Sequence, residues 1–286
     1  MIAPPSSAAA AATVAVHPVL RALLSRPYPA VMGVLNVTPD SFSDGGQFIA
    51  PDRALAQARR MIDDGADIID IGDESTRPYG GARPVSAEQE MERLRPVLAD
   101  IVSLGVPVSI DSMKAAVVGF ALASGAVIAN DVWGLQRDPD MAALAAARDC
   151  PVVVMHNRDH VDPDIDIMQD ISAFFARTLD IAARAGVPAG NIVLDPGIGF
   201  GKTPAQSMTA LARLDELRSF GLPLLVGASR KRFISSVIPS EPQQRLGGSI
   251  AAHLVAARRG AGIIRTHDVA ETAQALRVAA AIEEKR

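Results

Sequence analysis

The sequence predicts an α/β protein built as a single (β/α)8 barrel, the TIM barrel, because short apolar runs and helical stretches alternate along most of the chain. The apolar runs are rich in Val, Ile and Leu, as is typical of parallel strands buried on both faces. Nearly every run ends in a polar or charged residue, and the carboxyl ends of the strands of such a barrel share one face. The length of 286 residues suits one such barrel, although two ordinary domains would also fit it.

The predicted elements follow one another in the order that this fold requires. Strands are expected at residues 31–36, 67–72, 106–111, 126–131, 151–156, 191–195, 224–231 and 262–268, where β-branched and other apolar residues cluster. Helices are expected at residues 52–64, 86–105, 113–124, 140–149, 165–185, 205–220 and 269–284, where the apolar spacing is helical. Gly65 ends the first helix, and Ser86 with Gln89 forms the capping box that opens the second.

Composition argues against several classes of function. A net charge of −4 and a pI near 5.7 provide no basic face for DNA or RNA. No apolar segment reaches the roughly 20 residues that cross a membrane. The lone Cys150 cannot form an internal disulfide, which favours a cytoplasmic location. Residues 1–26 are rich in Ala, Pro and Ser and lack the features of a signal peptide, so we expect a flexible tail there and the barrel at residues 27–286.

The stretch from Asn191 to Thr203 carries the strongest local signal. A short β-branched run ends on Asp195, and the Pro and alternating glycines that follow fit neither helix nor strand. Pro196 stands where a phosphate-binding Walker loop needs Gly, and the glycine spacing does not match a dinucleotide fingerprint. The glycines favour close approach of backbone to a flat ligand. The alternative interpretation is a strand-to-helix turn in which Asp195 is only a cap.

Two other strand ends offer groups for metal and anion binding. Asn36 is followed by a polar loop, residues 37–46, whose many oxygen atoms could hold a hard cation such as Mg²⁺, although the same residues are ordinary in turns. Thr76 and Arg77 follow the second strand and offer a hydroxyl and a guanidinium suited to an anion. An arginine before proline is also common in solvated loops.

The polar strand ends together predict a site at one face of the barrel. They are Asn36, Asp70, Asp111, Asn130, His156, Asp195, Ser229 with Lys231, and Arg265 with His267. The acids and amides suit a flat heterocycle with N–H donors, whereas the cationic groups suit phosphate, with Lys231 between the two regions. Taken singly, Asp70 and Asp111 are equally well read as helix caps, and His156 or His253 as core histidines with satisfied hydrogen bonds.

These motifs resemble those of the dihydropteroate synthase family, in the same order and over residues 31–269. The resemblance is carried by Asn36-Val-Thr-Pro-Asp-Ser-Phe-Ser-Asp-Gly-Gly46, Glu74-Ser-Thr-Arg-Pro78, Ser109-Ile-Asp111, Asn130-Asp131, Met155-His156, Asp195-Pro-Gly-Ile-Gly-Phe-Gly-Lys202, Ser229-Arg-Lys231 and Arg265-Thr-His-Asp-Val269. It implies a homodimeric enzyme of folate synthesis that uses Mg²⁺. Its reaction joins 6-hydroxymethyl-7,8-dihydropterin diphosphate to p-aminobenzoate, and sulfonamides would inhibit it.

The resemblance also implies a role for individual residues. The implied catalytic residues are Asp111, Lys231, Arg265 and His267. The implied substrate-binding residues are Thr76, Arg77, Asp111, Asn130, Met155, Asp195, Phe200, Ser229, Lys231, Arg265 and His267. Among these, Arg265 and His267 match diphosphate positions, and Asn36 matches the metal position.

Some residues depart from the family pattern. Asp73, Tyr79 and Ile198 stand where Gly, Gly and Phe are usual, which bears on aminobenzoate affinity and sulfonamide sensitivity. Two other functions would also use a pterin-binding barrel. A pterin-barrel methyltransferase should lack the anion groups around Lys231 and Arg265, and a non-catalytic pterin-binding protein should have lost its metal or diphosphate positions. The sequence retains both sets.

Overall fold

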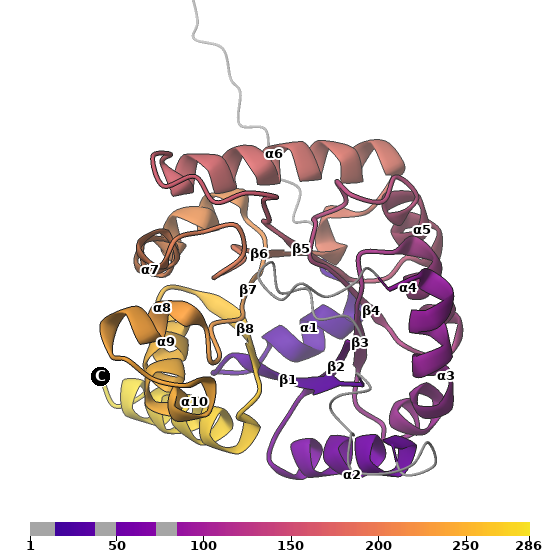
Figure 1. Ribbon diagram of the computed structural model, residues 1–286, viewed down its shortest axis with the longest axis horizontal. Coiled ribbons are helices and arrows are strands. Elements are labelled where there is room, and N and C mark those ends of the chain that lie inside the picture. Colours follow the sequence, from indigo (N-terminus) through magenta and orange to yellow (C-terminus); the bar gives the residue numbers. More distant parts are fainter. Residues whose placement is uncertain (1–14, 38–49, 73–84) are drawn as a thin grey trace, which may run out of the picture.

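The computed structural model describes residues 15–37, 50–72 and 85–286, and its strands close into a parallel barrel in chain order (Figure 1). The strands of these residues are β1 (Ala30–Asn36), β2 (Ile68–Gly72), β3 (Val108–Asp111), β4 (Ile128–Asp131), β5 (Val152–Met155), β6 (Ile192–Asp195), β7 (Leu224–Val226) and β8 (Ala261–Thr266). Pairing of β1 with both β2 and β8 closes the ring. The predicted single (β/α)8 barrel is confirmed.

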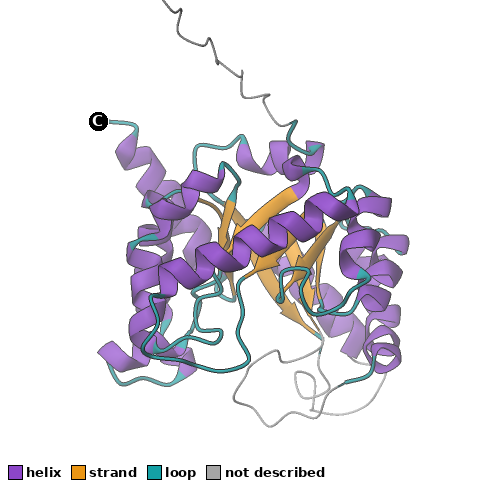
Figure 2. Ribbon diagram, turned by 90° about the horizontal axis from the view of Figure 1, so that it is seen from above, coloured by secondary structure: helices purple, strands orange, loops and turns teal. Residues whose placement is uncertain are grey.

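Helices cover the outside of the strands (Figure 2). The described residues form α1 (Pro18–Leu24), α2 (Ala50–Asp63), α3 (Ala87–Val102), α4 (Ala115–Ala123), α5 (Met141–Arg148), α6 (Ile167–Ala185), α7 (Pro204–Ala212), α8 (Arg232–Val237), α9 (Leu246–Arg258) and α10 (Val269–Glu283). The pattern did not predict α1, α8 or α9; α9 begins with two glycines in its first turn, which weaken a helical signal. The helix expected at residues 205–220 is two elements, because α7 is followed by a 3-10 helix at Leu214–Phe220. Within the described residues, none of the helices is both long and apolar enough to cross a membrane.

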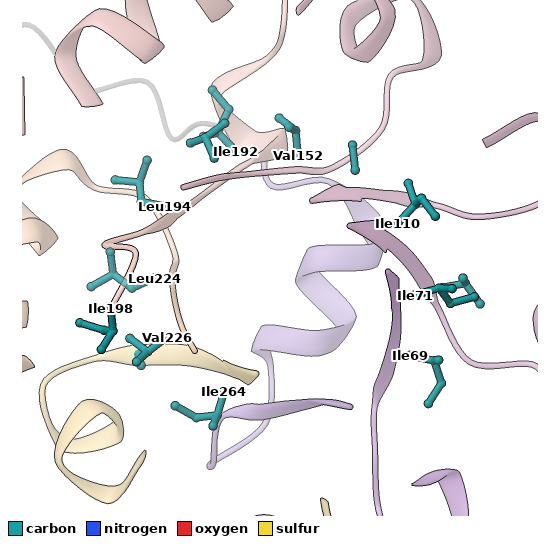
Figure 3. Packing of buried hydrophobic residues seen from close by; sticks show 14 of the residues in the cluster. Ile69, Ile71, Ile110, Val152, Ile192, Leu194, Ile198, Leu224, Val226 and Ile264 are labelled. Atoms are coloured by element: carbon teal, nitrogen blue, oxygen red, sulfur yellow. The ribbon is translucent and has the colours of Figure 1, made fainter. Parts of the chain in front are cut away.

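Alternate residues of each strand face opposite sides of the barrel wall. Figure 3 shows Ile69, Ile71 and Leu194 pointing outward, away from the barrel axis, where they belong to the larger hydrophobic cluster. Ile198 belongs to the same cluster and is buried. Ile198 therefore contributes to the packing of this cluster.

The inward residues form a smaller cluster that α1 closes at the amino-terminal end of the barrel. Its strand members are Ala30, Met32, Ile68, Ile128, Val153, Val193, Leu225 and Ile263. Leu20 and Leu23 of α1 are buried among them, and Figure 1 shows α1 in the centre of the ring of strands. The expectation of a flexible tail through residue 26 is therefore wrong for α1, whose leucines gain burial only in the folded barrel. Residues 1–14 lie outside the described part of the chain.

Candidate active site

The site lies at the carboxyl ends of the strands, where the inward face changes from apolar to polar. Two residues beyond members of the inner cluster, the inward positions hold Asp70 on β2, Asn130 on β4, Met155 on β5, Asp195 on β6 and Arg265 on β8. Because side chains alternate along a strand, the residues that precede these positions fix which way they face. The barrel therefore brings together residues that the sequence spreads over almost its whole length.

Arg265 joins two carboxylates across this mouth. Its Nε donates to Asp70 Oδ2 at 2.7 Å, and its Nη2 donates to Asp111 Oδ2, also at 2.7 Å. Asn130 Nδ2 donates to Asp70 Oδ2 at 3.1 Å. Burial opposes the charge of Arg265, but the two carboxylates outweigh it and raise the pKa of the guanidinium. Asp70 and Asp111 thus belong to one ion network, and the interpretation of them as helix caps is wrong.

The same two carboxylates keep unused acceptors. Asp70 Oδ1 and Asp111 Oδ1 are buried, and neither has a hydrogen-bond partner among the described residues. Burial raises the pKa of Asp111 to about 7, against the opposing charge of Arg265. A buried acceptor without a donor is unfavourable, so this region suits a ligand that supplies N–H groups.

Asp195 is a second inward carboxylate, and it is 5% exposed. Its Oδ1 accepts the N–H of Gly197 at 2.7 Å, as the interpretation of a turn requires. The charges of Lys231 and Arg265 also act on this carboxylate. Burial raises the pKa of Asp195 to about 6, with the Gly197 N–H acting in the opposite direction. Asp195 therefore combines the turn role with a position at the site.

The glycines after Asp195 let protein segments, and not only a ligand, approach closely. Gly197 and Gly201 have φ values of 65° and 54°, in the left-handed region. A Cβ on Gly197 would lie 2.0 Å from the backbone oxygen of His156, and one on Gly201 would lie 2.5 Å from Cβ of Arg158. The loop after β6 therefore packs directly against the loop after β5.

The rim of the site is formed by the segments after β6, β7 and β8. His267 Nδ1 lies 3.0 Å from Ser229 Oγ, and the backbone N–H of His267 donates to the same oxygen. Lys231 Nζ lies 4.0 Å from the centre of the Phe200 ring, a cation–π contact. Burial, reinforced by Arg265, lowers the pKa of His267 to about 3. This low pKa indicates an uncharged imidazole near neutral pH, so His267 offers hydrogen bonds rather than charge to an anion.

Asp268 stabilises this rim through an ion pair with Arg230. Its Oδ2 accepts from Arg230 Nε at 3.0 Å, and its Oδ1 accepts from Nη2 of the same guanidinium. Arg230 has a φ of 57°, an uncommon conformation for a residue with a side chain. The pair ties the residue before Lys231 to the residue after His267, so both side chains are held from one fixed point.

His156 does not join the inward ring. It follows inward-facing Met155 and is completely buried, with its Nε2 2.9 Å from Asp170 Oδ2 on α6 and its ring 5.0 Å from the ring of Phe174. Burial lowers the pKa of His156 to about 4. The interpretation of His156 as a core histidine is the correct one. His156 and Asp170 also line a polar cavity of about 420 Å³ between the loops after β4 and β5 and helix α6.

Some predicted site residues cannot be placed. Thr76, Arg77 and most of the polar loop at residues 37–46 lie outside the described residues. Asn36 is exposed at the end of β1 and offers one neutral amide oxygen. No cluster of three or more His, Cys, Asp or Glu suited to a metal occurs in the described parts of the chain. One amide oxygen fits Mg²⁺, which commonly takes few protein ligands and completes its shell with water and substrate phosphate.

Comparison with known protein families assigns this site to a class of enzyme. The sequence profile of the family described as pterin binding enzyme matches residues 32–267, which include every described residue of the site. A (β/α)8 barrel with buried carboxylates at its mouth is thus, for this chain, the framework of a pterin-binding enzyme.

Similar proteins define the member of that class. The dihydropteroate synthase of Bacillus subtilis (strain 168) is 45% identical over 263 residues, which cover 92% of this chain and 91% of the relative. A solved structure of Xanthomonas albilineans dihydropteroate synthase with 4-aminobenzoic acid aligns with a TM-score of 0.86 and 42% identity, covering 91% of this chain and 94% of that one. A structure of the same enzyme with 7,8-dihydropteroate gives a TM-score of 0.82 and 41% identity, covering 91% and 95%. The chain belongs to the dihydropteroate synthase family.

The structure also shows site residues that sequence reasoning missed. Asp70 was one of the polar strand ends, but no binding role was assigned to it, although it forms half of the Arg265 network. Lys202 stood inside a quoted motif without a function, yet it is buried behind the site and lies 2.6 Å from His156. The signal that could have identified Asp70 is its position as an acid inside an otherwise apolar strand, between Ile69 and Ile71.

Proposed function

We propose that this chain joins 6-hydroxymethyl-7,8-dihydropterin diphosphate to p-aminobenzoate at the carboxyl end of the barrel, releasing diphosphate and forming 7,8-dihydropteroate. The observation that carries this proposal is the set of buried acceptors around Arg265: Asp70 Oδ1 and Asp111 Oδ1 have no donor among the described residues. The amino-pyrimidinone edge of a pterin presents N–H donors to such acceptors. Membership of the dihydropteroate synthase family supports the same substrate.

The inward residues bind and orient the pterin. Asp195 accepts N–H groups at Oδ2, Asn130 contributes an amide, and Met155 provides an apolar wall. Asp111 places a fixed negative charge beside the pterin, where positive charge develops on the methylene carbon as the C–O bond to diphosphate breaks. The neutral arylamine then forms the new C–N bond, and its extra proton passes to solvent.

The rim residues stabilise the departing diphosphate. Ser229 and neutral His267 supply hydrogen-bond donors, and Lys231 supplies a positive charge next to Phe200. Asn36 would hold Mg²⁺, which when bound would neutralise part of the charge of the diphosphate. Thr76 and Arg77 belong to the same proposal through the resemblance of their motif. A homodimer and a cytoplasmic location remain proposals from the sequence.

The test is release of diphosphate by the purified chain with Mg²⁺ and both substrates, together with identification of 7,8-dihydropteroate by mass. Omission of p-aminobenzoate is the control for hydrolysis of the pterin diphosphate. We expect stoichiometric diphosphate and dihydropteroate. Pterin binding without dihydropteroate formation would contradict the proposed reaction and favour a non-catalytic role.

A further inference from the structure

Lys202 is a buried lysine on the loop between β6 and α7, and the proposed reaction makes no use of it. The residue is only 4% exposed. Its Nζ is 2.6 Å from His156 Nδ1, 2.9 Å from the oxygen of Gly197 and 3.1 Å from the oxygen of Phe200. An ammonium group has three N–H donors, and these three acceptors can take all of them. Lys202 therefore connects the loop after β5 with the loop after β6.

The hydrogen bonds of His156 define its protonation. Because Nδ1 accepts from Lys202, the ring proton is on Nε2, which donates to Asp170 Oδ2 at 2.9 Å. The His156 hydrogen bond lowers the pKa of Asp170, although partial burial acts in the opposite direction. A carboxylate, a neutral imidazole and an ammonium thus form a row from α6 to the loop after β6, and the two charges at its ends are opposite.

The loop that Lys202 fixes carries two groups of the proposed site. Gly197 accepts from Lys202 through its oxygen and donates its N–H to Asp195 at 2.7 Å. Phe200 accepts from Lys202 through its oxygen and places its ring 4.0 Å from Lys231 Nζ. Movement of this loop would move both the Asp195 carboxylate and the Phe200 ring.

We propose that Lys202 is a positioning residue, whose ammonium fastens the loop after β6 to His156 and so holds Asp195 and Phe200 in place for the pterin diphosphate. This proposal rests on the proposed function only in its choice of ligand. The donors of Lys202 are used by His156, Gly197 and Phe200, so we expect the lysine to contact neither the pterin nor the reacting atoms.

Stability alone does not account for a lysine at this position. Burial lowers the pKa of Lys202 to about 7, although the charges of Asp195 and Asp170 act in the opposite direction. The fold therefore disfavours the ammonium relative to the unfolded chain, in which the group keeps its ordinary pKa. Methionine has a similar length without the charge, so we expect Lys202→Met to remain folded.

The experiment compares the wild type with Lys202→Met, Lys202→Arg and the control Lys114→Met. Lys114 is also partly buried, with its Nζ 2.8 Å from Glu90 Oε2, but it lies at the start of α4 and outside the loop after β6. Titration calorimetry gives the Kd for pterin diphosphate, steady-state kinetics separates KM from kcat, and thermal unfolding checks the fold. We expect Lys202→Met to raise Kd and KM for pterin diphosphate at least tenfold and to lower kcat at saturation less than threefold. Lys202→Arg should recover part of the loss, and Lys114→Met should bind within threefold of the wild type.

A folded Lys202→Met protein with a Kd within twofold of the wild type would overturn the proposal. If that variant does not fold, Asp170→Ala replaces it, because loss of the acceptor releases His156 Nε2 and allows the proton to move to Nδ1, where it opposes Lys202. We expect a three- to tenfold rise in Kd, and an unchanged Kd would again refute the role. A wild type that binds pterin diphosphate but forms no dihydropteroate would contradict the proposed function and leave the comparison of Kd values intact.

Discussion

The variant Asp195→Asn tests whether the Asp195 carboxylate binds the pterin or only stabilises the turn after β6. In the structure, Asp195 Oδ1 accepts the N–H of Gly197 at 2.7 Å, and the side chain is almost fully buried. Asparagine can keep this hydrogen bond through its amide oxygen, which places the NH2 group where Oδ2 lies now. The turn would survive, and the change would act on the ligand.

The expected loss follows from this geometry. In the variant, an NH2 donor replaces the carboxylate oxygen that accepts N–H bonds from the pterin. The complex therefore loses a charge-assisted hydrogen bond and leaves buried donors facing one another. We expect a loss of roughly 2 to 5 kcal/mol in pterin binding, about 30-fold to several thousand-fold in affinity. Burial already disfavours the charge of Asp195, since its pKa is raised to about 6, so stability should change by only about 1 kcal/mol or less.

Asp131→Asn is the matched control. Asp131 is also a buried carboxylate at the end of a strand, and burial likewise raises its pKa to about 6. Its two oxygens accept the N–H groups of Trp133 and Leu135, at 2.8 Å and 2.6 Å. The Asp131→Asn protein should be less stable than the wild type, because an amide has only one acceptor oxygen and cannot accept both N–H groups. Its affinity for the pterin should stay near that of the wild type.

Titration calorimetry with pterin diphosphate at pH 8, with circular dichroism to check the fold, measures both variants. At that pH the Asp195 carboxyl is ionised in the wild type. An affinity of Asp195→Asn within about threefold of the wild type would remove this residue from the site and leave it only its role in the turn.

Four further outcomes are expected. Activity should stop in excess chelator and return with Mg²⁺, and full turnover under chelation would exclude a metal requirement. Pterin affinity should fall as the pH is lowered from 8 to 5, because Asp111 and Asp195, with pKa values raised by burial to about 7 and about 6, take up protons, lose their charge and turn one acceptor oxygen into a donor. Calorimetry that gives equal affinity at pH 8 and pH 5 would contradict this. Arg265→Met should cost about 3 kcal/mol of stability in denaturant unfolding, because Asp70 and Asp111 lose their partner inside the barrel. Leu20→Ala should cost about 2 to 5 kcal/mol, and a loss below about 1 kcal/mol would show that α1 contributes little to the barrel.

The sequence by itself determined the barrel and most of the ring at its mouth. Buried parallel strands require apolar residues on both faces, so β5 and β6 are visible as continuous runs, and the polar residue that ends each run marks the catalytic face. Alternation along a strand puts Asn130, Met155 and Asp195 on the same side as Ile128, Val153 and Val193, but which of the two sides faces the barrel axis is decided only when the strands close.

Only the tertiary structure decided the contacts between residues far apart in the chain. Arg265 pairs with Asp70, which lies 195 residues earlier, and no local pattern records such a pair. In the sequence, Leu20 and Leu23 are two apolar residues in a segment that resembles a tail. Only the folded barrel provides the apolar surface against which they are buried. His156 and Lys202 differ from the inward ring for the same reason: the direction of a side chain at a strand end, and the loop that packs over it, depend on the neighbouring strand and helix, whose positions are fixed only when the barrel closes.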